Sequence, residues 1–264
     1  MKYVTPKALT LRRVNLVLAG VGATGSWLLP ELARLDRTLL HLGHPEGLHV
    51  AVWDGDTVTP VNIGRQGFLP GDLRHNKAVA LVHRLNLTWG LRWEAKPVHL
   101  ASERVGGLAA DVLVTCTDSA KFRVELGRRY RKVSSSTLWL DCGNAEHTGQ
   151  VVLGHLGKPN SSSELRLPNV FDLYEAELLA SVGIDTGPSC SVEEALRHQD
   201  LTVNVLVAAH AYNLLWNLLR HGGLDAHGVF VDTRAVRSDP LPVDEDAWTW
   251  RGYDPGGRKG KKAA

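Results

Sequence analysis

A glycine-rich loop near the amino end of the chain constrains its fold more than any other feature. Gly20, Gly22 and Gly25 lie in the segment GVGATG, which follows an apolar run at 14–20 and opens a helical pattern at 24–42. Such glycines allow a tight turn, close helix–strand packing, and close approach of the backbone to a phosphate, which the free N–H groups of the helix attract. The loop predicts a bound nucleotide; the alternative is a tight turn that binds nothing.

Short apolar runs and helical patterns alternate along the rest of the chain. We expect further strands at 49–54, 91–100, 111–117, 137–141, 150–156, 227–232 and 235–244, and helices at 76–88, 119–132, 171–181 and 191–220. Runs that are apolar at consecutive positions are typical of parallel strands covered on both faces. We therefore predict a Rossmann-like α/β fold with a largely parallel sheet covered by helices on both faces.

The length of 264 residues fits a single large α/β domain, and no strong boundary divides it. The polar loop at 157–168 separates a nucleotide-binding half, at about 14–156, from a more irregular half, at about 169–250. Residues 1–250 are expected to form one domain. Residues 251–264 hold five basic residues against one acidic residue and are expected to be a flexible basic tail.

Composition argues against several classes of protein. No stretch reaches the ~18 apolar residues of a membrane span, and the amino end has no apolar leader segment. The net charge is +2, and with the basic tail set aside the body is not a basic nucleic-acid-binding domain. Three scattered cysteines, Cys116, Cys142 and Cys190, cannot form a disulfide scaffold and favour a reducing, cytoplasmic location.

An acidic residue ends the second strand of the expected sheet. Asp54 follows the run HVAVW, where a Rossmann domain places the carboxylate that binds ribose hydroxyls. Both NAD and ATP carry an adenosine ribose, so this position by itself does not distinguish them.

Polar residues that follow Asp54 favour ATP over NAD. A triphosphate needs hydrogen-bond donors and positive charge, whereas a nicotinamide dinucleotide needs no such cationic clamp. The alternative is that the cations are ordinary surface charges. The candidates for nucleotide binding are Asp56, Asn62, Arg65, Gln66 and, at the start of the next helix, Lys77.

A further carboxylate, Asp118, lies at the end of the strand at 111–117 and before a helix. The carboxyl edge of a parallel sheet borders the crevice in which ligands bind, and Mg²⁺ prefers one or two carboxylates together with phosphate oxygens. Asp118 is therefore a candidate magnesium ligand. It could also be the N-cap of the helix that follows, and the two roles are compatible.

These segments together resemble the ThiF/MoeB/HesA superfamily of adenylating enzymes, which includes the ubiquitin-activating enzymes. The resemblance is carried by GVGATG (20–25), by DGDTV, N and RQ within 54–66, by Lys77, by TDSAKFR (117–123) and by GQV (149–151). It implies an α/β fold with a Rossmann-like, mixed but mostly parallel sheet with helices on both faces and an ATP site at the carboxyl edge of that sheet. It also implies adenylation of the C-terminal glycine of a ubiquitin-like β-grasp protein. It also implies the roles of individual residues: Asp54 would bind ribose, Asn62, Arg65 and Lys77 the phosphates, and Asp118 magnesium.

The second half of the chain looks most like the ThiF-related protein of the plasmid-borne PRTRC system. The segments DTGPSCSVEEALRHQDLTVN, HGVFVD and PLPVD carry this resemblance. It implies neighbours of ubiquitin-like and ubiquitin-conjugating-like character, and relatives of this kind imply a homodimer.

The chain departs from the family pattern in three respects. Relatives usually carry an arginine finger on a helix ahead of the glycine loop, acting across a dimer, whereas here Arg12 and Arg13 adjoin the first strand. Ser119 replaces the usual Asn after the magnesium aspartate. Many relatives have two CxxC pairs for structural zinc; this chain has none, and its twelve histidines show no HExxH spacing, so no zinc site is expected.

Cys190 is the remaining candidate for chemistry. It lies in GPSCS, directly before Ser191 and Glu194, which form a capping box for the helix at 191–220. A helix amino end lowers the pKa of a thiol, and relatives place a thioester- or persulfide-forming cysteine in a comparable loop. The alternative is an inert, half-buried cysteine. For Cys116, inside an apolar strand, the inert interpretation prevails, and no base is evident beside Cys142.

The sequence thus predicts an enzyme that uses Mg²⁺ and ATP to adenylate a ubiquitin-like protein, with Arg65, Lys77 and Asp118 stabilising the phosphates and Cys190 as a possible thioester site. One alternative is a non-catalytic scaffold that keeps the fold and binds a partner. The other is an NAD-dependent oxidoreductase, against which Arg65, Gln66 and Lys77 argue.

Overall fold

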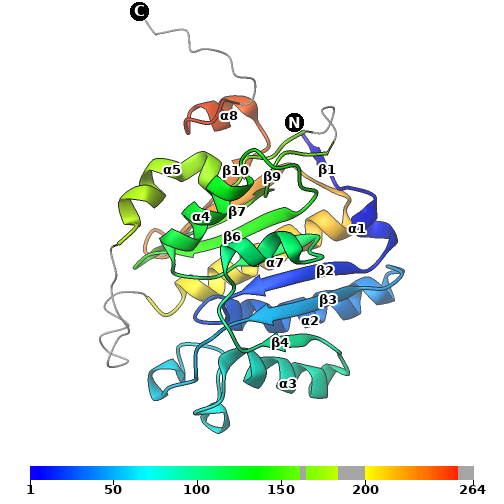
Figure 1. The fold of residues 1–264 in the computed structure, drawn as a ribbon, viewed down its shortest axis with the longest axis vertical. Helices are drawn as coiled ribbons and strands as arrows, with labels where there is room; N and C mark the ends of the chain where they lie inside the picture. Colours follow the sequence, from blue (N-terminus) through cyan, green and yellow to red (C-terminus); the bar gives the residue numbers. More distant parts are fainter. Residues whose placement is uncertain (161–164, 184–199, 255–264) are drawn as a thin grey trace, which may run out of the picture.

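An eight-stranded sheet runs through the molecule in a computed structural model that describes residues 1–160, 165–183 and 200–254. The strand order is β10-β9-β7-β6-β5-β2-β3-β4 (Figure 1). The strands are β2 (Val14–Ala19), β3 (Leu48–Trp53), β4 (Glu94–Lys96), β5 (Val112–Thr115), β6 (Leu138–Asn144), β7 (Thr148–His155), β9 (Ala226–Asp232) and β10 (Arg237–Pro242).

The sheet is mixed and mostly parallel, as predicted. Strands β4, β3, β2, β5 and β6 are parallel, and β7, β9 and β10 are added through antiparallel pairs. From β2 the chain first builds outward to β3 and β4, then returns to add β5 on the other side of β2. This reversal opens a crevice at the carboxyl ends of β2 and β5, where open α/β sheets bind their ligands.

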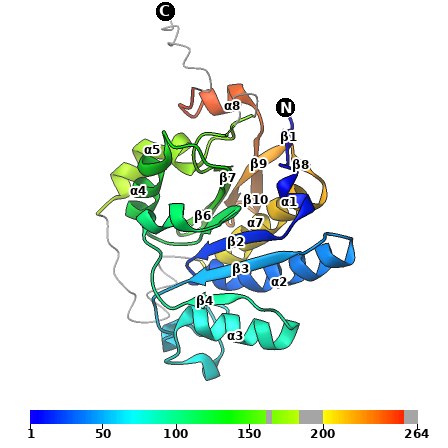
Figure 2. The same ribbon diagram turned by 45° about the vertical axis from the view of Figure 1, so that its right-hand side comes forward.

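Helices cover both faces of the sheet (Figures 1 and 2). Helix α2 packs against α7, and α4 packs against α5, while α3 lies beside β3 and β4 at one edge. These helices are α2 (Gly25–His41), α3 (Lys77–Trp89), α4 (Ala120–Tyr130), α5 (Val170–Ser181) and α7 (Val203–Arg220). The short elements are β1 (Tyr3–Val4), α1 (Ala8–Leu11), β8 (Gly223–Leu224), α8 (Glu245–Thr249) and the 3₁₀ turns Pro60–Asn62, Pro70–Asp72 and Ser102–Gly107.

The central strands are apolar because both of their faces are buried. All four residues of β5 are buried, and the indole of Trp139 on β6 is fully buried. Helix α2 adds leucines at helical spacing, including Leu28, Leu32 and Leu35, all inaccessible to solvent. This core holds the carboxyl edge of the sheet in one arrangement.

The carboxyl-terminal helix α8 closes one end of the core. Trp248 is fully buried, and its indole N–H donates to Nε2 of His227 at 2.8 Å. Nδ1 of His227 lies 2.7 Å from the carbonyl oxygen of Leu153, so the ring donates from Nδ1 and accepts at Nε2. Burial lowers the pKa of His227 to about 4.

Two predicted elements differ from those observed. The strand expected at 91–100 is limited to Glu94–Lys96, because Pro97 follows and has no N–H for a ladder. The helix expected at 191–220 begins at Val203 in the described part of the chain, because the N–H of Asp200 donates to the carbonyl of Glu146 instead of entering a helix. Cys190, the capping box of Ser191 and Glu194, and most of the basic tail lie outside the described residues.

None of the helices that the structure describes is long and apolar enough to cross a membrane.

Candidate nucleotide site

The glycine loop joins β2 to α2 at the carboxyl edge of the sheet. Gly20 has a φ of +89°, and a Cβ there would lie 2.7 Å from the carbonyl oxygen of Cys116. A Cβ on Gly25 would lie 2.1 Å from the carbonyl oxygen of Gly20. A Cβ on Gly22, in contrast, would meet no atom within 4 Å beyond its chain neighbours. The turn itself therefore requires Gly20 and Gly25, whereas Gly22 leaves its backbone open to a ligand.

Asp54 ties the glycine loop to the end of β3. It is buried, and its two carboxylate oxygens accept the backbone N–H groups of Val21 and Asp56, each at 2.8 Å. Burial raises the pKa of Asp54, against the lowering effect of these two hydrogen bonds and of Lys77. Asp54 lies where sequence analysis predicted a ribose ligand, and it also shapes the loop.

Lys77 begins α3 and is buried beside Asp54. Its Nζ lies 3.0 Å from Oδ2 of Asp56, whose other oxygen lies 3.5 Å from Nε2 of His99. The side-chain amide of Asn76, the N-cap of α3, donates to the carbonyls of Asp54 and Asp56. The fold therefore brings the predicted residues Asp54, Asp56 and Lys77 together through hydrogen bonds.

Arg65 lies in the loop after the Pro60–Asn62 turn, which packs on the first turn of α2. The indole N–H of Trp27 donates to the carbonyl of Arg65 at 3.4 Å, and the hydroxyl of Ser26 accepts the N–H of Gly67. Arg65 is half-buried, and this burial lowers the pKa of its guanidinium. Within the described ranges no carboxylate lies within 4.0 Å of that guanidinium. It is a desolvated positive charge that this part of the chain does not neutralise.

Gln66 and Asn62 differ in whether their side-chain oxygens have hydrogen-bond partners. The side-chain oxygen of Asn62 accepts the N–H and the hydroxyl of Thr59, at 2.9 and 3.1 Å, and so caps its own turn. The side-chain oxygen of Gln66 is buried and has no hydrogen-bond partner in the described structure. An unpaired buried oxygen is costly, so Gln66 fits a site that a ligand or water completes.

Asp118 lies at the end of the chain segment that follows β5, and its side chain is exposed. The alternative role suggested by the sequence, an N-cap, belongs to Ser119, whose hydroxyl accepts the N–H of Phe122 at 3.1 Å. The N-cap interpretation of Asp118 is therefore wrong. Its carboxylate stands at the edge of the sheet, accessible to a ligand.

Beneath the Asp118 segment lies a buried ion pair that sequence analysis missed. Arg123 of α4 donates from Nε to Oδ1 of Asp141 on β6 at 2.7 Å, and the hydroxyl of Thr115 donates to the same oxygen at 2.5 Å. Burial works against the charge on Arg123, but the charge of Asp141 and its hydrogen bond raise the Arg123 pKa above its usual value. The pair fixes α4, and with it the Asp118 segment, to the sheet.

A second feature that the sequence did not reveal joins three elements beside the glycine loop. The hydroxyl of Thr24 donates to the side-chain oxygen of Asn204 on α7 at 2.9 Å. The amide of Asn144, at the end of β6, donates to both of these residues. Thr24 and Asn204 are 180 residues apart, and Thr24 and Asn144 are 120 apart, so no local pattern could have indicated the network.

The profile of the ThiF family matches residues 3–239. The chain belongs to the ThiF family. Its glycine loop, Asp54 and Lys77 all lie inside the matched range. A search of curated protein sequences finds no match.

Solved structures share the fold of this ThiF-family chain at low sequence identity. E. coli MccB with ATP has a TM-score of 0.56 and 14% identity, covering 87% of this chain and 63% of MccB. The microcin C7 biosynthetic enzyme MccB with N-formylated MccA has a TM-score of 0.55 and 12% identity, with coverage of 87% and 64%. PaaA has a TM-score of 0.55 and 11% identity, with the same coverage. This chain thus spans less than two thirds of the length of these proteins.

The arginines ahead of the glycine loop lie away from the site of this ThiF-family protein. Arg12 precedes β2, at the amino edge of the sheet, and makes a two-pronged ion pair with Asp111, which precedes β5, at 2.6 and 2.8 Å. Arg13 lies 3.4 Å from Glu46. Both arginines therefore lie at the opposite edge of the sheet from the glycine loop.

Of the two described cysteines of the ThiF-family chain, Cys142 lies on β6, whereas Cys116, expected inside a strand, directly follows the end of the neighbouring strand β5. Cys142 is buried, and a hydrogen bond with Cys116, together with burial, raises its pKa well above the usual value. A thiol held in its neutral form is a poor nucleophile, so Cys142 is not suited to nucleophilic chemistry in this arrangement.

Proposed function

We propose that this protein binds ATP with Mg²⁺ at the carboxyl edge of its sheet and transfers AMP to the C-terminal carboxylate of a protein or peptide. The observation that carries the proposal is the half-buried Arg65, whose desolvated guanidinium is not neutralised within the described residues. A bound phosphate would supply the missing negative charge. Solved structures of the same fold include MccB with ATP and MccB with MccA, which supports a nucleotide and a peptide substrate.

The residues around the loop fit a nucleotide. The open space above Gly22 would take a phosphate close to the backbone, and the unpaired oxygen of Gln66 would gain a partner. Asp54 would bind the ribose with its remaining acceptor capacity, and Asn62 and Lys77 would contact the phosphates. Lys77 would have to share its charge between Asp56 and the ligand.

Asp118 fits a magnesium ligand, since its carboxylate is exposed at the same edge. The ion would screen negative charge on the phosphates, which lets a carboxylate approach them. The carboxylate oxygen of the substrate attacks the α-phosphorus, the bond to the β-phosphate breaks, and pyrophosphate leaves. The protein needs to supply no covalent group, only positive charge and orientation.

The resemblance of the chain to the ThiF/MoeB/HesA superfamily supports a ubiquitin-like β-grasp protein as the substrate, and the PRTRC resemblance supports a ubiquitin-conjugating-like partner. It also supports a homodimer. Arg12 and Arg13 lie at the opposite edge of the sheet from the glycine loop, so neither is placed to act as an arginine finger on the nucleotide of its own chain. Residues 1–250 would act as one adenylation domain, and no zinc would be bound.

A first test uses the nucleotide itself. Calorimetric titration with Mg·ATP should show binding, and titration with NAD should not. Tight NAD binding without heat from ATP would favour the oxidoreductase alternative and overturn the proposal.

Asp118→Ala tests the metal role. The variant should stay folded and lose about 100- to 1,000-fold of adenylate formation, the usual loss when a group that stabilises charge in the transition state is removed. Pyrophosphate exchange with candidate β-grasp partners measures the loss, and Glu245→Ala, an exposed acid on α8, serves as the control. Activity near that of the wild type in a folded Asp118→Ala protein would rule out the metal role.

A thioester at Cys190 would be a second step. The thiolate would attack the acyl carbon of the adenylate, and AMP would leave. Cys190→Ala should then keep pyrophosphate exchange and lose a thiol-sensitive adduct with the partner on a non-reducing gel, whereas Cys116→Ala and Cys142→Ala should keep it. An adduct that persists in Cys190→Ala would contradict this step.

One observation favours the scaffold alternative. The side-chain oxygen of Asn62 already accepts a hydrogen bond from Thr59, and Lys77 already pairs with Asp56. Neither side chain therefore needs a nucleotide as its partner. Absence of both ATP binding and pyrophosphate exchange in a folded protein would support the scaffold.

A further inference from the structure

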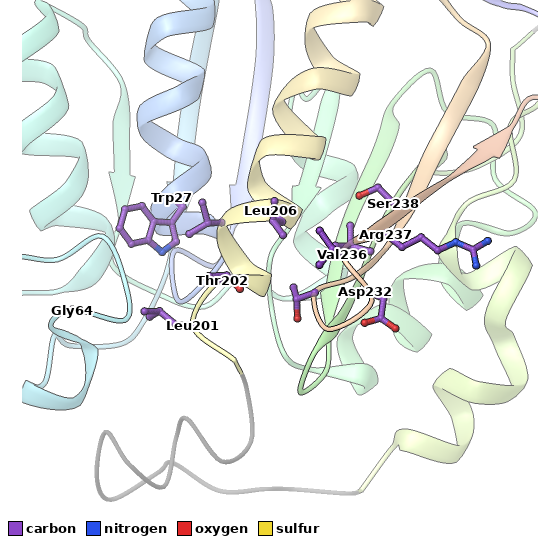
Figure 3. Close-up of a pocket in the computed structure, with 12 residues that line it drawn as sticks. Trp27, Gly64, Leu201, Thr202, Leu206, Asp232, Val236, Arg237 and Ser238 are labelled. Atoms are coloured by element: carbon purple, nitrogen blue, oxygen red, sulfur yellow. The ribbon is translucent and has the colours of Figure 1, made fainter.

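A cavity of about 630 Å³ opens at the carboxyl edge of the sheet (Figure 3). It lies between the start of α2, the start of α7 and the turn that joins β9 to β10. Its walls are largely apolar and include Trp27, Leu201, Val205, Leu206, Val231 and Val236.

The rim of this cavity exposes apolar side chains. Leu201 and Val205 are 51% and 42% exposed, and Val236, at the turn between β9 and β10, is 91% exposed. Val236 also has a φ of +51°, a left-handed conformation that is rare and strained for a β-branched residue. Exposed apolar side chains beside an open cavity suit contact with an apolar group of a ligand, and residues in sparsely populated backbone conformations cluster at functional turns.

The cavity shares its walls with the candidate nucleotide site. The N–H of Ser26 bonds to the carbonyl of Gly22, so the helical path from Gly22 to Trp27 covers about 8 Å along the axis. Gly64 lines the cavity directly before Arg65, and the Trp27 indole both lines the cavity and donates to the Arg65 carbonyl. A chain whose end lies above Gly22 could therefore place an earlier side chain in the cavity.

We propose that this cavity binds an apolar side chain of the adenylated substrate, two or three residues before its C-terminal carboxylate. This inference rests on the proposed function, which requires that carboxylate to lie beside the phosphates. An extended chain advances about 3.3 Å per residue, so two or three residues span the distance from the phosphates to the cavity. The cavity then selects substrates by the side chain that enters it, and the substrate is a peptide or protein with an extended, apolar C-terminal segment.

Affinity selection tests the proposal without knowledge of the natural substrate. A pool of hexapeptides with free C-termini, randomised at the last four positions, is passed over the immobilised full-length protein with Mg²⁺ and a non-hydrolysable ATP analogue, and the bound peptides are sequenced by mass spectrometry. Leu, Ile, Phe or Met should be enriched about tenfold at the second or third position before the C-terminus, as burial of a side chain of that size predicts. The same pool with amidated C-termini should show no such enrichment.

Two matched variants decide whether this cavity is responsible. Leu206→Asp places a charge in the cavity wall, and Leu87→Asp places one on α3 outside the cavity, where Leu87 is 88% exposed. Leu206→Asp should lose the enrichment and Leu87→Asp should keep it. Absence of enrichment with the wild-type protein, or enrichment that persists in Leu206→Asp, would overturn the proposal.

Two further measurements separate the remaining outcomes. Both variants should bind Mg·ATP as the wild type does in calorimetry. Failure of the wild type to bind ATP would refute the proposed function, whereas ATP binding without peptide enrichment would refute only the cavity proposal. Sedimentation velocity should show the same oligomeric state for all three proteins. A dimer that Leu206→Asp converts to a monomer would instead make this surface an interface between two copies of the chain and overturn the proposal.

Discussion

Two regions of the molecule bury an arginine, but only one of them also supplies a carboxylate. Arg65 is half-buried in the loop between β3 and α3, and Arg123 is buried where α4 packs on β6. Arg123 lies 2.7 Å from Asp141, which keeps its pKa above the usual value despite burial. Burial lowers the pKa of Arg65 because no described carboxylate opposes it.

The difference separates charges that serve the fold from charges that serve a ligand. A buried ion pair formed within the chain fixes one arrangement of helix and sheet, and breaking it leaves an uncompensated charge. Arg123 and Thr115 both bond to Oδ1 of Asp141, while Oδ2 is buried without a hydrogen-bond partner in the described structure. A partly buried cation without a neighbouring carboxylate lowers the stability of the fold until a bound anion compensates its charge. Mutation of Arg123 is therefore expected to change the stability of the fold, and mutation of Arg65 to change ligand binding.

Arg123→Met gives the largest expected effect. Because Asp141 would be left buried and unpaired, the free energy of unfolding should fall by about 3–5 kcal/mol. Urea denaturation followed by circular dichroism measures the change, and the double variant Arg123→Met/Asp141→Leu should recover part of it. A loss below about 1 kcal/mol would show that the pair does not carry the structural role assigned to it.

His227 extends the comparison to a buried group whose two ring nitrogens are both satisfied inside the chain. Its folded-state pKa of about 4 lies below the value of 6.5 for the unfolded chain. Between these values the unfolded chain takes up a proton that the folded protein does not, so stability falls as the pH drops from 6.5 to about 4, by about 3 kcal/mol in all. Denaturation at several pH values should show this slope, and His227→Gln should lack it. Identical pH profiles for the two proteins would contradict the assignment.

Arg65→Gln gives the smallest of these effects and the opposite pattern. Loss of one charge-assisted contact should weaken ATP binding by about 10- to 100-fold, while the free energy of unfolding stays the same or rises slightly. Calorimetry and urea denaturation measure the two quantities, and Arg34→Gln, an exposed arginine on α2, is the control. If Arg65→Gln destabilised the fold as Arg123→Met does and left ATP affinity intact, the distinction between the two regions would fail.

Local sequence signals located most of the elements. The glycine loop, Asp54 at the end of β3 and Lys77 at the start of α3 lie where the patterns predicted them. These signals depend on residues close in sequence: consecutive apolar positions for a buried strand, and glycine where only glycine fits. The prediction was wrong where distant contacts decided, as at Asp200, whose N–H bonds to Glu146 instead of entering a helix.

By itself, the sequence determined the mixed α/β sheet, the glycine turn and the family to which the chain belongs. Only the tertiary structure decided which polar groups are satisfied inside the chain: Asp141 neutralises Arg123, Ser119 rather than Asp118 caps α4, and Arg65 keeps its charge without a described carboxylate. The physical reason is the distance along the sequence over which each property is set. Backbone conformation and periodic burial are set by near neighbours, whereas charge compensation depends on side chains that folding brings together from separate strands and helices, and a list of residue types does not contain those distances.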